Sequence, residues 1–276
     1  MNELVIEAGH TERNYWRDLF RYRELFYFLA WRDVLVRYKQ TVIGILWAVL
    51  RPLLQMVVFT FIFNKVAKLP PEGVPYPVMV FGAMLPWQLF ATSLSEGSGS
   101  LVTNANLISK VYFPRLIVPA SSVIVSFVDF AISMVLLAVL MVIYKVWPGW
   151  PLVALPLFTA LALLASAGAG TWLAALNVKY RDFRYVVPFI VQFGLYISPV
   201  GFSSKLVLEK YGETGLMIYS LNPMVGVIDG FRWSISGGST PFPTQSLEFA
   251  CVTIAFLLIT GIWYFRKTER TFADII

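Results

Sequence analysis

Residues 37–52, RYKQTVIGILWAVLRP, decide the fold of this chain. Arg37 and Lys39 precede an apolar run that begins at Thr41, which is typical of a helix that enters a bilayer from the cytoplasmic side. Arg51 and Pro52 place a charge and a helix-breaking residue inside that run. A charge at such depth costs about 2.5 kcal/mol or more. This first span therefore fits a translocation path better than a simple anchor.

The composition excludes a soluble globular domain. Of the 276 residues, 58% are hydrophobic and 14% are charged, whereas a soluble domain has about 25% charged residues. One His and one Cys exclude a disulfide framework and most metal sites, which need clustered ligands. Because Lys and Arg gather at the ends of apolar runs, the net charge of +6 indicates membrane flanks and no nucleic-acid partner.

The N-terminal region, residues 1–40, shows no secretion signal and is expected to stay in the cytoplasm. Its residues 14–31 predict a helix that lies in the membrane interface, with Arg17, Arg21 and Glu24 on the polar side. An ordinary amphipathic helix packed on a soluble core is the alternative, but the chain offers no such core. The predicted apolar side consists of Tyr15, Trp16, Leu19, Phe20, Leu25, Phe26 and Leu29.

Six apolar runs within residues 41–266 predict an all-α integral membrane protein with six transmembrane helices. The motif ASAGAG at residues 165–170 predicts close packing of the fourth span on another helix. A cytoplasmic tail is expected from residue 267 onward. The predicted spans are residues 41–66, 76–94, 116–144, 152–176, 185–197 and 249–265.

Residues 201–244, before the last span, predict two re-entrant half-helices rather than a loop. Residues 216–221 and 224–235 are apolar pieces too short to cross a bilayer. Asn222 and Pro223 between them have the order of a helix cap followed by a proline at the first helical position. We expect both pieces to dip into the exterior face, with Asn222 and Pro223 at an exterior gate.

The distribution of basic residues predicts the orientation of the spans. If both termini are inside, the interior segments carry 15 of the 22 Lys and Arg residues and the exterior segments carry 6. This excess agrees with the positive-inside rule.

Four stretches, in this order, resemble the permease subunit of bacterial ABC exporters of polysaccharides and polyol phosphates, the O-antigen and teichoic-acid exporter family. The similarity extends from Arg37 nearly to the end of the chain. Arg51 departs from the pattern, because the family has a neutral or variable residue there. The stretches are the opening motif at 37–52; VFGAMLPWQLF at 80–90 with SLVTNANLISKVYFPR at 100–115; NVKYRDFRYVVPFIVQFGLYISPVGFS at 177–203; and YSLNPMVGVIDGFRW at 219–233 with FRKTERTFADII at 265–276.

The resemblance implies a homodimeric permease of the bacterial plasma membrane that works with two copies of a separate ATPase subunit. Together they would export a lipid-linked glycan or a teichoic-acid-like polymer. The chain contains no G-x-x-x-x-G-K-[ST] loop, so we expect no catalysis and no cofactor on this chain, with ATP and Mg²⁺ bound by the partner.

Three other functions are considered. An ABC permease for a drug, haem or a lipid is the nearest alternative, and the four stretches argue against it. An integral-membrane enzyme of glycolipid assembly would need paired acids, and an ion-coupled carrier would need several intramembrane acids. The Asp and Glu residues are scattered along the sequence, and this distribution favours neither the enzyme nor the ion-coupled carrier.

The segment TNANLISK at residues 103–110 is either a coupling helix that docks on the ATPase or a solvated connector, and the resemblance favours the first. Thr103 or Asn104 would cap the helix, and Phe113 and Pro114 would end it. The candidate contacts are Thr103, Asn104, Asn106, Leu107, Ile108 and Lys110, joined by Tyr180, Arg181 and Asp182 of the next cytoplasmic loop.

Aromatic side chains near helix breaks predict a path for a sliding polymer, because aromatic faces pack on sugar rings; packing on lipid or on other helices is equally compatible. Arg51 would attract a phosphate or an anionic sugar, or else snorkel to the interface. Asp129, a buried acid within a span, would either bond a neighbouring helix in its neutral form or meet the substrate. The aromatic candidates are Trp87, Phe90, Phe189, Phe193 and Tyr196.

Overall fold

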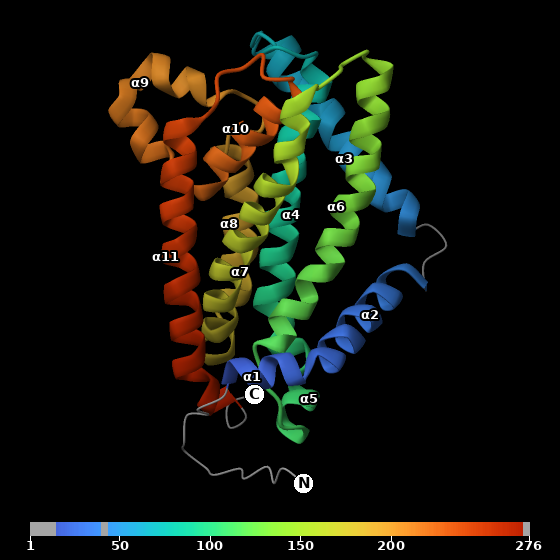
Figure 1. Cartoon of the computed structure of the whole chain (residues 1–276), viewed down its shortest axis with the longest axis vertical. Coiled ribbons are helices and arrows are strands. Elements are labelled where there is room, and N and C mark those ends of the chain that lie inside the picture. Colours follow the sequence, from blue (N-terminus) through green and yellow to red (C-terminus); the bar gives the residue numbers. More distant parts are fainter. Residues whose placement is uncertain (1–14, 40–43, 273–276) are drawn as a thin grey trace.

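The computed structural model describes residues 15–39 and 44–272, which form a helical bundle with no strand among them (Figure 1). The predicted helix start at Asn14, the predicted span start at Thr41 and the tail from residue 273 lie outside these ranges. The predicted fold class, an all-α integral membrane protein, is confirmed.

The long helices run between two ends of the bundle, which we call the α5 end and the α9 end after the elements found there (Figure 1). In chain order the α-helices are α1 (Tyr15–Arg21), α2 (Arg23–Lys39), α3 (Gly44–Phe59), α4 (Tyr76–Thr103), α5 (Ala105–Lys110), α6 (Ile117–Ile143), α7 (Leu155–Lys179), α8 (Phe183–Ile197), α9 (Ser204–Tyr219), α10 (Pro223–Ile235) and α11 (Thr244–Thr268). The π-helical turn η1 (Thr60–Val66) extends α3, and the 3₁₀ turns η2 (Trp150–Ala154) and η3 (Glu269–Thr271) precede α7 and follow α11.

Five helices in the described ranges are long and apolar enough to cross a membrane: Val49–Val66, Tyr76–Thr103, Ile117–Ile143, Trp150–Lys179 and Thr244–Thr271. The predicted fifth span is the shorter helix α8. Its 15 residues reach about 22 Å, less than the hydrocarbon thickness of about 30 Å. The fifth span is therefore broken, and its end meets the re-entrant segment.

Several boundaries differ from the prediction. Residues 95–103 were predicted as a polar connector but continue α4. Their hydroxyl groups are satisfied within the helix, since they donate to carbonyls of the preceding turn, as Ser95 does to Ala91 at 2.8 Å and Ser100 to Gly97 at 2.7 Å. The predicted half-helix at 216–221 is the end of the longer helix α9, which is interrupted at Gly212 (φ 68°). The predicted basic loop at 177–184 is reduced to residues 180–182.

The main core surrounds α4, which is buried along most of its length and packs against α6, α7 and α10. The small-residue motif of α7 brings this helix close to α11, as predicted. A Cβ atom on Gly168 would lie 2.7 Å from the Leu258 nitrogen, and one on Gly261 would lie 2.3 Å from the Gly168 carbonyl oxygen. No side chain larger than hydrogen fits at either position.

The N-terminal helices divide their apolar side chains between the protein and the outside. Tyr15 and Leu29 are buried, whereas Trp16 and Phe20 of the same predicted face are exposed. The aromatic residues Tyr27, Phe28 and Trp31 of α2 also point outward. The predicted single apolar face is therefore wrong, because part of it packs on the chain's own core.

Candidate functional site

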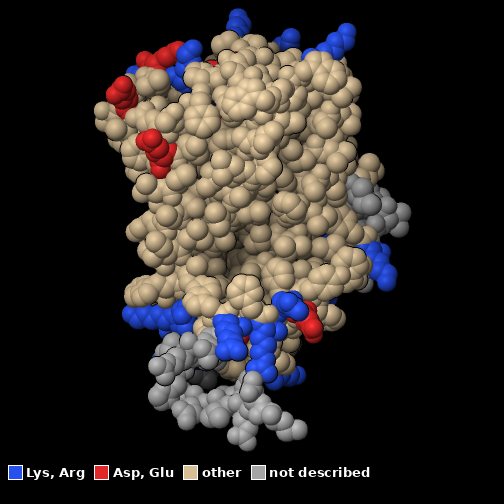
Figure 2. All heavy atoms as spheres, viewed as in Figure 1, with Lys and Arg blue, Asp and Glu red and all other residues tan. Residues whose placement is uncertain are grey.

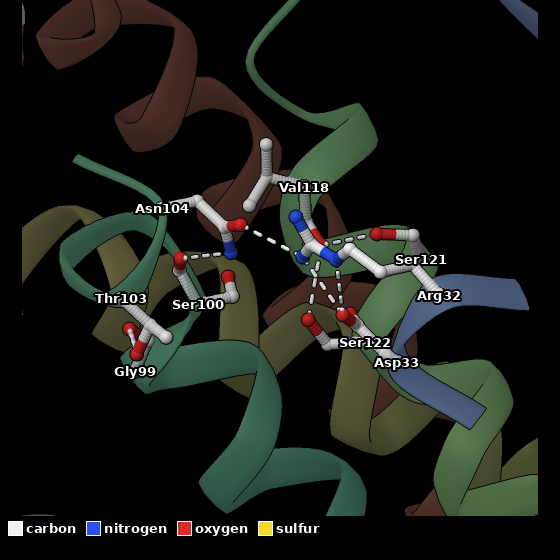
Figure 3. Close-up of polar contacts among 9 residues, drawn as sticks. All are labelled: Arg32, Asp33, Gly99, Ser100, Thr103, Asn104, Val118, Ser121 and Ser122. Carbon is white, nitrogen blue, oxygen red and sulfur yellow. Dashed lines mark hydrogen bonds and ion pairs between the residues drawn. The ribbon is translucent and has the colours of Figure 1, made fainter. Parts of the chain in front are cut away.

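The predicted coupling helix, α5, follows α4 after one residue, Asn104. Asn104 occupies the predicted cap position, but its side chain does not cap α5. It donates to the Ser100 carbonyl at 2.9 Å and accepts from Arg32 at 2.9 Å (Figure 3). Thr103 donates to the Gly99 carbonyl instead of capping. The hydrogen bonds of Thr103 and Asn104 to the last turn of α4 thus set the position at which α5 begins.

Arg32 joins α2 to this junction, and the sequence analysis did not identify it. Its guanidinium group forms an ion pair with Asp33 at 2.7 Å while it donates to Asn104. Figure 3 shows Arg32 and Asp33 approaching the α4–α5 junction from α2, beside Ser121 and Ser122 of α6. A charged pair inside an otherwise apolar helix, FLAWRDVLV at 28–36, was the available signal.

The side chains of α5 divide between the chain's own core and the surface. Ile108 is 3% exposed and lies in a second hydrophobic core at the α5 end, with Leu107 half-buried against it. This corrects the prediction that Ile108 anchors in a partner's groove, because it anchors α5 to its own chain. We call the exposed residues of α5 and of its two flanks the α5 surface. They are Thr103 at the end of α4, Asn106, Ser109 and Lys110 of α5, and Val111 and Tyr112 after it.

The second core joins the N-terminal helices and the last helical turn to α5. The Tyr15 hydroxyl donates to the Glu269 carboxylate at 3.4 Å, and the Arg115 main-chain nitrogen donates to the same oxygen at 2.8 Å. Burial raises the pKa of the Tyr15 hydroxyl, and the charge of Glu269 raises it further, so the phenol remains a donor. Phe272 is fully buried here. Residues 267–272, predicted as a tail, are therefore part of the packed structure.

The second predicted contact loop, residues 180–182, is exposed. The Lys179 ammonium lies 5.3 Å from the centre of the Tyr180 ring, and Arg181 and Asp182 point outward. Within the described residues, no hydrogen bond, ion pair or ring contact joins this loop to α5. The structure keeps the two predicted contact segments apart.

Asp129 lies near the middle of α6, within the predicted span, and 22% of its side chain is exposed. Its carboxylate forms an ion pair with Arg37 of α2 at 2.7 Å and accepts from the Tyr38 hydroxyl. Arg37 also reaches Glu96 of α4 at 3.3 Å. Burial raises the pKa of Tyr38, as does its hydrogen bond to Asp129. Asp129 therefore joins α6 to the end of α2.

The predicted path residues separate into two groups. Trp87 and Phe90 are 4% and 8% exposed, and the Trp87 ring lies against Gly194, where a Cβ atom would be 2.4 Å from it. These two residues belong to the core of the chain, which corrects the prediction for them. Phe189, Phe193 and Tyr196 are exposed and form one stripe along α8 together with Tyr185, the most exposed of the four. We call these four residues the α8 stripe.

Arg51 is exposed on α3, and among the described residues it has no ion-pair or hydrogen-bond partner. Gln55, one turn further along α3, accepts a hydrogen bond from Gln88 of α4 at 2.7 Å. This polar contact holds α3 against α4 one turn from the charged Arg51.

At the α9 end, the predicted cap is confirmed. Asn222 accepts from the Met224 main-chain nitrogen at 3.0 Å, and Pro223 occupies the first helical position of α10. Arg232, counted among the exterior charges and within the predicted half-helix 224–235, is 6% exposed inside α10, where it faces Asp229 at 4.0 Å. This buried pair was not predicted.

Among residues 15–39 and 44–272, no group of three His, Cys, Asp or Glu side chains could hold a metal ion.

Comparison with known proteins identifies the family. The model of the ABC-2 type transporter family matches residues 24–235, from α2 to the end of α10. The O-antigen export system permease protein RfbA of Myxococcus xanthus is 28% identical over 261 residues, which cover 94% of this chain and 98% of that protein. A protein of the same name from Klebsiella pneumoniae is 28% identical over 246 residues, 89% of this chain and 92% of its own. The polysialic acid transport protein KpsM of Escherichia coli is 20% identical over 240 residues, 87% of this chain and 91% of its own. These relatives confirm the resemblance to polysaccharide export permeases, and the chain belongs to the ABC-2 type transporter family.

Proposed function

We propose that this chain is the transmembrane subunit of an ATP-driven exporter that moves a lipid-linked polysaccharide or a polyol-phosphate polymer out of the bacterial cytoplasm. The observation that carries the proposal is the nearly end-to-end match to permeases named for O-antigen export. The multi-span helical fold, with an exposed aromatic stripe on its broken span, supports it.

The proposal includes a homodimer and two copies of a separate ATPase subunit, which binds ATP and Mg²⁺. The α5 surface is the main contact with that subunit. It is exposed, while Asn104 and Ile108 hold α5 to the rest of the chain, so a force applied to α5 reaches α2 and α4 without being lost in a flexible loop. Residues 180–182 form a second, separate contact.

The α5 end is the cytoplasmic end in this proposal, and the chain lies in the plasma (inner) membrane with both termini inside. Figure 2 shows Lys and Arg in a band at the α5 end, charges of both signs at the α9 end, and a mostly uncharged face between them. A basic band at one end supports the assignment of that end to the cytoplasm.

The α8 stripe forms one wall of the polymer path, and the stripe of a second copy forms the opposite wall. Its exposed rings lie on the outside of a single chain, with Tyr196 stacked on Phe59 of α3, and a sugar polymer can slide over them. Arg51 contributes a positive charge that attracts phosphate groups of the substrate.

A genetic and biochemical pair of measurements tests the function. Deleting the chain's gene should abolish surface polymer and cause polymer to accumulate inside the cell, and a plasmid copy should restore export. The purified chain alone should not hydrolyse ATP, whereas its complex with the product of a co-encoded ATPase gene should. Unchanged surface polymer together with lost export of a drug or a lipid would assign the chain to another class of ABC permease.

A further inference from the structure

The corner between α8 and α9 differs from the other connections of the bundle. α8 ends at Ile197, before a helix of its length has crossed the hydrocarbon, and the chain then turns toward α9. Backbone groups at this depth need partners from the protein, because lipid supplies none. We call residues 197–201, ISPVG, the α8 corner.

Four side chains from outside the α8 corner bind it. Tyr219 of α9 donates to the Ile197 carbonyl at 2.8 Å, and Asn222 donates to the Ser198 hydroxyl at 2.9 Å. The two further donors are Arg232 of α10, which reaches the Val200 carbonyl at 3.0 Å, and Tyr76 of α4, which reaches the Gly201 carbonyl.

Packing closes the same corner. Ser198 and Val200 are completely buried. A Cβ atom on Gly201 would lie 2.3 Å from the Phe63 ring, so η1 touches the backbone directly. One turn before the corner, Gly194 meets the Trp87 ring in the same way. The corner is thus fixed to four other elements by directional bonds and by contacts that leave no space.

The body of α8 is held differently. Within the described structure, no side-chain hydrogen bond or ion pair joins residues 183–196 to another helix. Its inward face is an apolar seam of Phe183, Val187, Val191 and Leu195, spaced four residues apart. Lipid tails are as apolar as these side chains, so separating such a seam in a bilayer loses packing contacts but no hydrophobic burial and no directional bond.

We propose that the α8 corner is a fixed pivot and that α8 swings about it, with the seam opening toward the α5 end. The swing moves the α8 stripe, because the stripe lies on the outer side of the same helix. Residues 180–182 are joined directly to the swinging end, so a partner that pushes there drives the movement. The use of this movement in export rests on the proposed function, whereas the pivot is a property of this chain alone.

The pivot changes the role of the predicted exterior gate. Asn222 and Pro223 start a buried helix, and the Asn222 side chain holds the α8 corner, so this helix start belongs to the fixed joint and does not move aside. Tyr76, Tyr219, Asn222 and Arg232 are positioning residues, since they act through the corner and not on the polymer.

Distance measurements between spin labels test the pivot. The natural Cys251, exposed on α11, supplies one label site. The second site is Ile197→Cys, the first residue of the corner, or Tyr185→Cys near the swinging end, both exposed positions. Diluting the labelled chain with unlabelled Cys251→Ala chain limits the signal to distances within one copy.

In the isolated chain in nanodiscs, we expect a broader distance distribution for the Tyr185 site than for the Ile197 site. In the complex with its ATPase, a non-hydrolysable ATP analogue should shift the Tyr185 distance and leave the Ile197 distance in place. Equal widths at both sites in the isolated chain, or equal shifts in the complex, would overturn the pivot; no shift at either site would overturn the swing. Because the first measurement needs no ATPase, its result stays separate from a failure of the proposed function.

Mild variants of the holding side chains provide the second arm. Tyr219→Phe combined with Asn222→Asp removes two donors with little change of volume and retains the cap oxygen of Asn222. The Ile197 distribution should broaden and export should fall, while co-purification with the ATPase is unchanged. The control is Tyr211→Phe, an exposed tyrosine of α9 with no bond to the corner. A narrow Ile197 distribution in the double variant would contradict the role of these side chains.

Discussion

Asn104 is the residue on which the position of the proposed coupling helix, α5, depends, because it joins three helices. It ends α4, begins α5 and accepts a hydrogen bond from Arg32 of α2. Asn222 likewise directly precedes a helix, α10, but the Asn222 side chain caps that helix. The difference arises from Arg32, which lies 72 residues away in the chain.

Replacing Arg32 should loosen this junction. A hydrogen bond to a charged group contributes about 1.5–3 kcal/mol, and less here because the Arg32 side chain is 40% exposed. We expect Arg32→Ala to leave the ATPase bound but to raise the number of ATP molecules hydrolysed per polymer exported. Arg17→Ala, at an exposed arginine of α1, is the control. An unchanged ratio in Arg32→Ala would show that the junction does not transmit force.

The glycine contact between α7 and α11 gives a prediction about stability. A Cβ atom on Gly261 collides with the Gly168 carbonyl, and overpacking of this kind costs about 1–3 kcal/mol. Gly261→Ala should therefore lower the thermal stability of the purified chain in detergent. Gly99→Ala is the matched control, since a Cβ atom there meets nothing within 4 Å. Equal melting temperatures for both variants would contradict the tight contact.

At the scale of the element, α5 has one face buried in its own chain and one exposed face, which we propose as the contact with the ATPase. Ile108 faces inward, so Ile108→Ala should mainly destabilise the permease, by about 2–5 kcal/mol as for other buried aliphatic truncations. Val111 and Tyr112 are 49% and 46% exposed and continue the outer face. A partner that covers them gains apolar contact area.

Removing the outer apolar side chains should weaken the ATPase complex. Half-burial of a Val and a Tyr contributes about 2 kcal/mol, which corresponds to roughly a thirtyfold change in affinity. We expect the double variant Val111→Ser, Tyr112→Ser to insert normally and to lose most of its ATPase in a pull-down. The control pair is Met217→Ser, Ile218→Ser on α9, which is similarly exposed. If both pairs retain the ATPase equally, the contact lies elsewhere, and residues 180–182 become the next segment to test.

The α8 stripe predicts a different phenotype. Phe189→Ala with Phe193→Ala removes two rings in contact, whose centres lie 4.2 Å apart, without touching the α5 surface. ATPase binding should persist while polymer export slows. The control is Phe256→Ala with Ile259→Ala, two exposed residues of α11. Normal export in the α8 variant would show that the α8 stripe does not line the polymer path.

The elements that the sequence predicted well are those with a local signal. Long apolar runs predicted four spans over nearly their whole length. The Asn222-Pro223 pair predicted the start of α10, and the small residues at 165–170 predicted the contact between α7 and α11. The predictions that failed concern residues whose surroundings are set by contacts between segments far apart in the sequence. Trp87 looks like a path residue until Gly194 is placed against it, and Arg232 looks like a loop charge until Val200 is seen to accept its hydrogen bond.

At the scale of the whole molecule, the two ends of the bundle are built for different purposes. The α5 end has its own core, in which both ends of the described chain meet the coupling helix. The α9 end carries a broken span whose corner is bound by side chains from three directions. The proposed orientation places the α5 end in the cytoplasm and the α9 end outside.

Cysteine accessibility in intact cells tests that orientation. On a Cys251→Ala background, single cysteines at Lys68, Lys145 or Glu213 should react with a membrane-impermeant thiol reagent added outside. Cysteines at Ser109 or Asp182 should react only after the membrane is opened. All five positions are exposed in the structure, so failure to react reports the membrane barrier and not burial within the protein. Reaction of Asp182→Cys from outside would reverse the orientation, and it would also remove residues 180–182 from contact with a cytoplasmic ATPase. Reaction of Lys145→Cys and Asp182→Cys from the same side would mean that α7 does not cross the membrane at all.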